Sequence, residues 1–317
     1  MTQMAMAVAP RRSKKPVMNK GNKTTWQLMK EHKASYSMLV PFLLIFLTFT
    51  VIPVIISVIL GFTYFNVLEF PKWIGWTNYV RLFVDDDIFI LAVRNTFTFA
   101  AIVGPVSYIM CLFFAWIINE LPSKLRAFMT LVFYAPSIAG GLSIWLLVFS
   151  GDMYGYLNSF LLRLGIIGEP VNWLRDARYM MTICIVVQLW SSLGASFLSL
   201  RAGFNTIDRQ YYEAAAVDGL KSRWQELWYI TLPMMSPHLM LSAILAITGA
   251  FGAGALITAL VGFPSTGYAV HTIMHHLQDF QGTRLERGYA AAISTLLFII
   301  MLTTNRVTQK FLRKVGT

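Results

Sequence analysis

Six apolar stretches, each near the length of a membrane-crossing helix, alternate with polar segments along the chain. They cover residues 37–62, 91–118, 127–149, 179–200, 237–260 and 288–305. Because an α-helix rises about 1.5 Å per residue, roughly 20 apolar residues are needed to cross the hydrocarbon of a bilayer. The pattern therefore predicts an all-α integral membrane protein with six transmembrane helices, of which the last is the shortest.

Two polar segments stand out from this pattern. Residues 1–36 are basic and otherwise small or polar, and we expect a cytoplasmic tail that is disordered up to about residue 24. A signal peptide is the alternative, but the apolar run that follows is too long and no small-residue cleavage site comes after it, so we expect the tail to stay attached. Residues 37–317 are expected to form one transmembrane domain, with a charged amphipathic loop at 206–233.

The order of residues in this loop predicts a first short helix. Asp208 can cap its start, and Gly219 stands where a left-handed residue would end it, which places the helix at about 208–218. Three consecutive alanines, Ala214–Ala216, favour the helix and give it a face small enough for the backbone of another protein to approach.

A second helix is expected at about 221–230. It should end before Pro233, because a proline disfavours helical backbone at the residue before it and cannot donate a helical hydrogen bond. The alternative for the whole loop is an ordinary amphipathic segment lying on the bilayer surface.

Composition supports a membrane protein. The chain is 56% hydrophobic, its mean hydropathy is +0.58 and its formal net charge is +11. Nucleic-acid binding would need a contiguous basic patch, whereas the basic residues are spread over the polar segments, so no nucleic-acid partner is expected. Cys111 and Cys184 fall inside apolar stretches, which indicates small buried hydrophobes rather than a disulfide or a metal site.

The distribution of charge orients the predicted spans. If the N-terminus is cytoplasmic, 18 of the 26 lysines and arginines lie on the cytoplasmic side, whereas 9 of the 15 acids lie on the other side. This is the positive-inside pattern, and it places both termini and the 206–233 loop in the cytoplasm. The positive charge then has anionic lipid headgroups as its counterpart.

The sequence holds no recognisable site for energy conversion. No complete phosphate-binding loop occurs, since Gly21-Asn22-Lys23-Thr24 lacks the earlier glycine and a preceding strand. The spans carry no Asp, Glu or Lys near their middle, where ion-coupled carriers place one. We therefore expect no catalytic residue and no cofactor in this chain, and energy supplied by a partner.

Two groups of residues could suggest an enzyme. His271, His275 and His276 lie close in sequence but lack metalloprotease spacing, and we interpret them as one face of an interfacial helix in an outer loop, with no metal bound. Ser191 and Ser192 lie in an apolar span without the glycines of a nucleophile elbow, which indicates packing or pore-lining hydroxyls.

The 206–233 loop also resembles a known motif. Its residues are similar to the "EAA" loop of permease subunits in binding-protein-dependent ABC importers, where the loop is the docking helix for a cytoplasmic ATPase. From about residue 38 to 314 the chain looks like a carbohydrate permease of the type I importer class, similar to the maltose and glycerol-phosphate permeases. The matching residues in the loop are Glu213, Ala214, Ala215, Asp218, Gly219, Ile230, Leu232 and Pro233. The matching residues elsewhere are Trp73, Gly75, Trp76, Asn78, Tyr79, Asp87, Phe89, Ala92, Asn95, Thr96, Gly155, Leu157, Asn158, Gly165, Trp173, Leu174, Gly288, Tyr289, Ala290 and Ala292.

The resemblance implies the MetI-like permease fold and a set of partners. These are a second, similar permease subunit, two nucleotide-binding ATPase subunits that bind ATP and magnesium, an extracytoplasmic solute-binding protein and a carbohydrate substrate. The chain would lie in the lipid bilayer of a bacterial cytoplasmic membrane as a conformational gate. One departure is Gly262-Phe263-Pro264, where the family pattern has Gly-Gly-Pro, and it bears on the outer gate.

The resemblance also implies two groups of site residues. The ATPase-docking group is Tyr212, Glu213, Ala214, Ala215, Asp218 and Gly219. Alignment by position with the larger maltose permease subunit places a second group near the sugar site: Ser191, Ser192, Ala195, Thr248, Gly249 and Gly252. Because the second group consists of small residues, we hypothesise an oligosaccharide rather than a monosaccharide. That these residues form packing seams between helices is the alternative.

Two other functions stay open at this point. One is a permease of the same class for another solute, such as a polyamine or a phosphate ester, which the identity of the solute-binding protein would decide. The other is a secondary carrier or membrane scaffold without an ATPase, which co-purification would decide.

Overall fold

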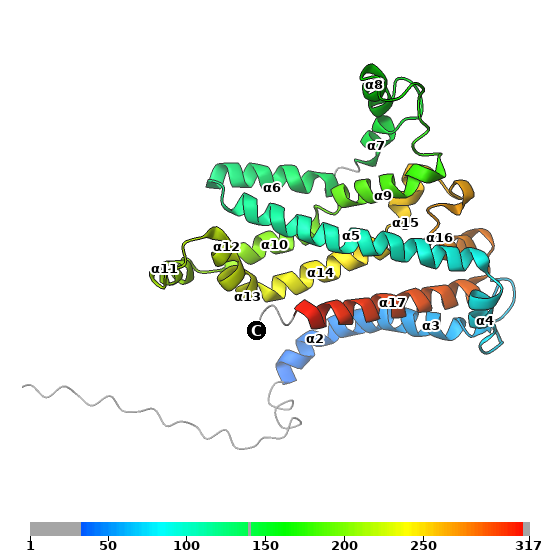
Figure 1. The fold of residues 1–317 in the computed structure, drawn as a ribbon. Coiled ribbons are helices and arrows are strands. Elements are labelled where there is room, and N and C mark those ends of the chain that lie inside the picture. Colours follow the sequence, from blue (N-terminus) through cyan, green and yellow to red (C-terminus); the bar gives the residue numbers. More distant parts are fainter. Residues whose placement is uncertain (1–32, 139–140, 313–317) are drawn as a thin grey trace, which may run out of the picture. The chain divides into compact units, whose positions relative to one another are not determined.

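The computed structural model describes residues 33–138 and 141–312 (Figure 1). The chain divides into two compact units, and the boundary along the sequence lies between Ile55 and Ile56. The described part of the first unit is a continuous helical segment that consists of α2 (Lys33–Phe46), a π-helical turn at Leu47–Val51 and the start of α3 (Ile52–Leu60).

The second unit begins within α3 and contains the remaining elements. A short antiparallel ribbon comes first, with β1 (Thr63–Tyr64) paired to β2 (Lys72–Trp73). It is followed in chain order by α4 (Thr77–Val84), α5 (Asp87–Asn119), α6 (Ser123–Ile138), α7 (Leu142–Val148), α8 (Tyr156–Arg163), α9 (Ala177–Ser191), α10 (Ala195–Thr206), α11 (Arg209–Val217), α12 (Arg223–Glu226), a π-helical turn at Leu227–Thr231, α13 (Leu232–Met234), α14 (Ser236–Phe251), α15 (Gly254–Val261), a 3-10 turn at Thr266–Tyr268, α16 (Ile273–Gln278), a π-helical turn at Asp279–Thr283 and α17 (Arg287–Leu312).

The centre of the second unit is a group of long helices around α5. Within it, α5 packs against α10 and α14, and α14 packs against α17, so that α5, α14 and α17 run side by side (Figure 1). α11, α12 and α13 lie at one end of these helices, which we call the α11 end, and α4 and α16 lie at the other, the α16 end.

Two hydrophobic clusters hold the second unit together, one toward each end. Toward the α11 end, Cys111 of α5 and Phe197 of α10 are both fully buried among leucines that include Leu227 and Leu232. Toward the α16 end, Cys184 lies in the larger cluster with Phe89 and others. Both cysteines are buried free thiols, as the sequence indicated.

The helices agree with an integral membrane protein. Among the described residues, four helices are long and apolar enough to cross a bilayer: Ser35–Leu60, Asp87–Asn119, Ala177–Thr206 and Arg287–Leu312. Two further bent pairs, Ser123–Ser137 with Leu142–Val148 and Arg223–Met234 with Ser236–Phe251, raise the number to six if each pair is one span.

Three of the predicted spans contain breaks that hydropathy did not indicate. The stretch 127–149 is interrupted between α6 and α7, which form a bent pair. The stretch 179–200 is interrupted between α9 and α10, where Gly194 has φ −123° and ψ −122°. The stretch 237–260 is interrupted between α14 and α15, where Gly252 has φ −90° and ψ 9°. A glycine at each of these last two breaks lowers the free-energy cost of leaving the helical conformation, because glycine has a low helix propensity and no Cβ.

Candidate functional site

α11 forms as the sequence predicts. The carboxylate of Asp208 accepts a hydrogen bond of 3.1 Å from the backbone N–H of Gln210, which caps the first turn. The helix ends at Val217, and Gly219 follows with φ +94°. This left-handed conformation suits glycine and terminates the helix. The prediction of a helix at 208–218 is therefore confirmed.

The second helical segment of the loop is longer than expected. It begins with a capping box between Ser222 and Gln225 and continues through the π-helical turn and α13. The prediction that it ends before Pro233 is wrong. In the π-helical turn the N–H of Leu232 bonds to the carbonyl of Leu227, five residues back, so the register has already changed where the proline lacks its N–H.

α11 has one face turned to the loop and one face turned outward. On the inward face, Ala215 is buried, and the hydroxyl of Tyr212 lies 2.9 Å from Oγ1 of Thr231. Burial raises the pKa of Tyr212, so this hydroxyl keeps its proton. The outward face is exposed and small or charged: Glu213, Ala214, Ala216 and Val217. Val217 is 88% exposed, and an apolar residue so open at the end of a helix is suited to a protein contact.

The structure thus divides the six predicted docking residues into two sets. Glu213, Ala214, Asp218 and Gly219 are exposed. Tyr212 and Ala215 instead hold α11 against the second helical segment, since both lie on the inward face. Tyr212 and Ala215 share this face because they are three residues apart on the helix, whereas Asp218 and Gly219 lie beyond its end.

Contacts that the sequence did not reveal join this loop to the end of α5. The guanidinium of Arg223 lies 3.5 Å from the carboxylate of Glu120 and 2.8 Å from that of Glu226. The indole rings of Trp116 and Trp224 have centroids 4.9 Å apart. A polar cavity of about 550 Å³ lies between these residues and α11. Arg223 and Glu120, like Trp224 and Trp116, are about 100 residues apart along the chain, so no local signal could have paired them.

Arg201 also differs from the expectation. The predicted span 179–200 ends just before it, whereas α10 contains it and continues to Thr206, and the residue is 7% exposed. Its Nη1 donates a hydrogen bond of 3.0 Å to Oδ1 of Asn119 at the end of α5. This contact helps a buried arginine to be tolerated and ties α10 to α5.

The predicted pathway residues lie at the two helix breaks. Ser191, Ser192 and Ala195 surround the break between α9 and α10, and Thr248, Gly249 and Gly252 surround the break between α14 and α15. The two regions approach each other, because a Cβ built on Gly249 would lie 3.9 Å from Nε2 of Gln188 in α9. Ala195, Thr248, Gly249 and Gly252 are exposed in the chain by itself, and the two serines are half-buried.

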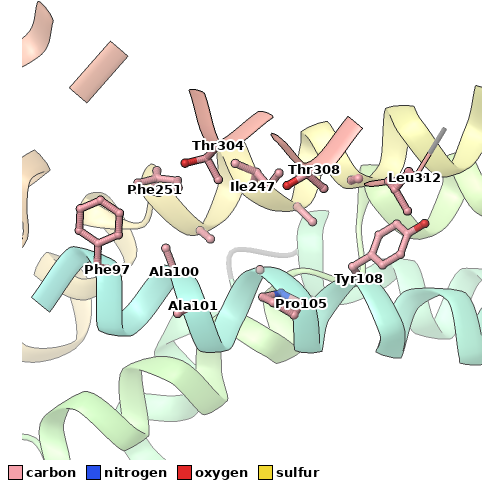
Figure 2. A pocket seen from close by; sticks show the side chains of 14 residues that line it. Phe97, Ala100, Ala101, Pro105, Tyr108, Ile247, Phe251, Thr304, Thr308 and Leu312 are labelled. Atoms are coloured by element: carbon pink, nitrogen blue, oxygen red, sulfur yellow. The ribbon is translucent and has the colours of Figure 1, made fainter. Parts of the chain in front are cut away.

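An apolar cavity lies elsewhere among the long helices. Its volume is about 380 Å³, and it is bounded by α5, α14 and α17. Figure 2 shows Phe97, Ala100 and Pro105 of α5 opposite Thr304 and Thr308 of α17. None of the six pathway residues lines it. With few hydroxyl groups in its wall, this cavity is poorly suited to a polar solute.

The three histidines at the α16 end are buried, which contradicts their interpretation as an interfacial helix face. His271, His275 and His276 are only 2–3% exposed. Nε2 of His276 lies 2.9 Å from the carboxylate of Asp86, and Nδ1 of His275 lies 2.8 Å from the hydroxyl of Thr272. Asp86, which is 190 residues away along the chain, and the neighbouring hydroxyl of Thr272 are the polar partners that allow the burial. Within residues 33–138 and 141–312 no group of three or more His, Cys, Asp and Glu is arranged to hold a metal ion.

Comparison with known proteins agrees with this arrangement. Residues 112–316 match the family described as binding-protein-dependent transport system inner membrane component. The chain is 31% identical to the probable ABC transporter permease protein YesP of Bacillus subtilis (strain 168), over 88% of this chain and 90% of that protein. It is 26% identical to the arabinooligosaccharides transport system permease protein AraP of the same organism, over 93% and 94% of the two chains.

The solved structures give the same answer for the fold. The chain superposes with a TM-score of 0.75, at 23% identity, on a chain in the crystal structure of a bacterial ABC transporter involved in the import of the acidic polysaccharide alginate. The match covers 93% of this chain and 100% of the other. The expected importer-permease fold is therefore confirmed. Together with the match over residues 112–316, this shows that the chain belongs to the family of inner membrane components of binding-protein-dependent transport systems.

Proposed function

We propose that this chain is one of two permease subunits of an ATP-driven importer that carries a carbohydrate, specifically an oligosaccharide, across the cytoplasmic membrane. The observation that carries the proposal is α11, whose exposed face of small residues and Glu213 stands on a helix fixed from behind by Tyr212 and Ala215. The names of the relatives, which refer to arabinooligosaccharides and to alginate, support a saccharide as the substrate.

In this proposal the α11 end and both termini lie in the cytoplasm. A partner ATPase binds the exposed face of α11, and ATP and magnesium are held by the ATPase, so this chain performs no chemistry. When the ATPase dimer closes, it moves α11. The contacts of Arg223 and Trp224 with Glu120 and Trp116 pass that movement to α5, and the spans rotate as rigid bodies. A solute-binding protein delivers the sugar from the other side.

The six small residues at the helix breaks are proposed to line the path together with the second permease subunit. Their exposure in the isolated chain leaves room for a sugar or for a partner helix. Thr248→Trp and Gly252→Trp would each place an indole ring in that space. We expect both variants to assemble with the ATPase but to lose ATP-dependent uptake into vesicles. Normal uptake by both would remove these residues from the path.

The docking role of α11 is tested on the assembled complex. Glu213→Lys with Gly219→Pro should release the ATPase during purification and abolish ATP-dependent uptake into proteoliposomes. Glu69→Lys, an exposed charge reversal in the segment between the β1 and β2 strands, is the matched control and should leave both intact. A complex that stays assembled and active with the double substitution contradicts the docking role. Uptake by the wild-type chain without any ATPase would instead indicate a secondary carrier.

A further inference from the structure

A chain of hydrogen bonds at the α16 end begins at Asp86. Its carboxylate accepts hydrogen bonds from the Tyr289 hydroxyl at 2.7 Å, from the Phe89 backbone N–H at 2.9 Å and from Nε2 of His276 at 2.9 Å. Burial opposes ionisation, but these hydrogen bonds outweigh it and hold the pKa of Asp86 below its usual range. Asp86 is therefore an ionised group that only accepts hydrogen bonds.

The acceptor at Asp86 fixes the proton positions on two histidines. His276 must carry its proton on Nε2, and because burial lowers its pKa, the ring is neutral and Nδ1 is an acceptor. Nε2 of His271 lies 3.3 Å from that Nδ1, so it is the donor. Burial, with the neighbouring histidines, lowers the pKa of His271 to about 4, so this ring is neutral too. Its own Nδ1 is therefore an acceptor.

This last acceptor has no partner among the described residues. Nδ1 of His271 is buried and makes no hydrogen bond, and the residue as a whole is only 3% exposed. A buried polar atom without a partner destabilises the fold by about 1–3 kcal/mol, and such atoms are rare in native proteins. The atom thus calls for a donor from outside the chain, such as an O–H or N–H group.

The histidine ring lines a cavity of about 300 Å³ whose other groups suit a polyhydroxyl compound. Nε of Arg284 donates to Oδ2 of Asp279 at 2.8 Å, which leaves the second carboxylate oxygen and the two terminal nitrogens of the guanidinium for other partners. Aromatic rings flank the acceptor, since the centroids of Phe263 and Tyr268 lie 5.9 Å and 5.2 Å from that of His271. Hydroxyl groups can both donate and accept, and the C–H faces of a sugar ring can pack on aromatic rings.

We propose that this cavity is an entry subsite that binds one sugar unit of the transported saccharide, with a sugar hydroxyl donating to Nδ1 of His271. The inference rests on the proposed function, which places the α16 end outside the cytoplasm and makes a saccharide the solute. At about 300 Å³ the cavity is at the small end for ligand sites, so it holds a single ring rather than a chain. The subsite is separate from the six small residues at the helix breaks.

The test uses the detergent-solubilised complex of both permease subunits and the ATPases, without the solute-binding protein. Maltotriose, arabinotriose and tri-galacturonate are first screened for ATP-dependent uptake in the reconstituted system with its binding protein. The trisaccharide that is taken up is then titrated into the complex by calorimetry. His271→Phe keeps an aromatic ring but removes the acceptor, and we expect it to weaken binding about three- to tenfold. Arg284→Gln and Asp279→Asn should weaken binding in the same direction.

Two variants serve as matched controls. His275→Phe alters a histidine that is equally buried but does not line the cavity, and Arg178→Gln alters an exposed arginine that is also paired with an aspartate. Both should bind the trisaccharide like the wild type. If His271→Phe does not assemble, Arg284→Gln and Asp279→Asn decide the question, since their side chains lie nearer the surface.

Three results would overturn the entry subsite. One is unchanged affinity in the cavity variants. Another is that the complex binds no trisaccharide without the solute-binding protein while the variants still show reduced uptake. That result would mean that the cavity receives a side chain of the solute-binding protein instead of a sugar. The third is a structure of the sugar-soaked complex in which only water meets His271. Failure of the proposed function differs from all three, because the wild-type complex would then take up none of the trisaccharides.

Discussion

Gly219 shows how much of the loop depends on the backbone of one residue. Its backbone φ is +94°, a value that residues with a Cβ rarely adopt. A Cβ built there would meet no atom within 4 Å. Gly219→Ala should therefore act through backbone strain alone and destabilise the end of α11 by about 1 kcal/mol. We expect weaker retention of the ATPase during purification of the complex.

The matched control for this substitution is Gly168→Ala. A Cβ at Gly168 also meets nothing within 4 Å, but the backbone there is not left-handed. ATPase retention should be unchanged in this variant. Equal loss in both variants would show that the left-handed turn has no special role in docking.

At the scale of secondary structure elements, the start of α17 is fixed against β1 by direct backbone contact. The N–H of Gly288 donates to the carbonyl of Phe65 at 3.0 Å, and a Cβ on Gly288 would overlap the carbonyl oxygen of Thr63. Gly288→Ala must push the helix away from the strand, which we expect to cost about 2 kcal/mol and to lower the melting temperature of the complex. Gly282→Ala, where a Cβ has open space, should leave it unchanged.

The contact between the loop and α5 makes a second prediction at this scale. Trp224→Ala removes the ring contact with Trp116, worth about 1 kcal/mol, and loosens the link through which α11 would move α5. We expect the complex to keep hydrolysing ATP but to transport less sugar per ATP, as measured in proteoliposomes. Trp228→Ala removes a tryptophan of the same segment that is 62% exposed. If it lowers the ratio equally, the ring pair is not the link.

The elements also show where sequence reasoning succeeds and where it ends. The cap at Asp208 and the stop at Gly219 were predictable because each acts within a few residues of itself. The breaks at Gly194 and Gly252 were not, since a glycine in an apolar stretch can equally mark close helix packing.

Distant pairs in the site were beyond prediction for a different reason. Hydrogen bonds with Asn119 and Asp86, 82 and 190 residues away, help Arg201 and His276 to be buried. A single sequence gives no indication of which polar residues meet. For this reason the exposed residues of α11 were anticipated, whereas the groups that support them from behind were not.

For the whole molecule, α5 connects the two regions to which function is assigned. Its end at Glu120 meets the second loop helix, while near its other end Nδ2 of Asn95 donates to the carbonyls of Tyr268 and His271, at 3.1 Å and 3.0 Å. Oγ1 of Thr96 accepts from the backbone N–H of Ile273 at 2.9 Å. A movement of α5 at the α11 end would therefore displace the segment that contains the proposed entry subsite.

The stability of the whole complex should depend on pH through the histidines of that segment. Burial lowers the pKa of His271 and of His275 to about 4, below the ordinary value of 6.5. Between these values the unfolded chain binds more protons than the folded one, so stability is full above pH 6.5 and falls as the pH drops toward 4. The melting temperature should be lower at pH 5 than at pH 7.5, and His271→Phe should reduce that difference.

Asp86 does not change the stability between pH 5 and pH 7.5, because its pKa is lowered from 3.8 and its contribution to stability is lost only in stronger acid. An equal melting temperature at both pH values would mean that the rings already carry protons when folded, and the assignment of Nδ1 of His271 as a free acceptor would fail with it.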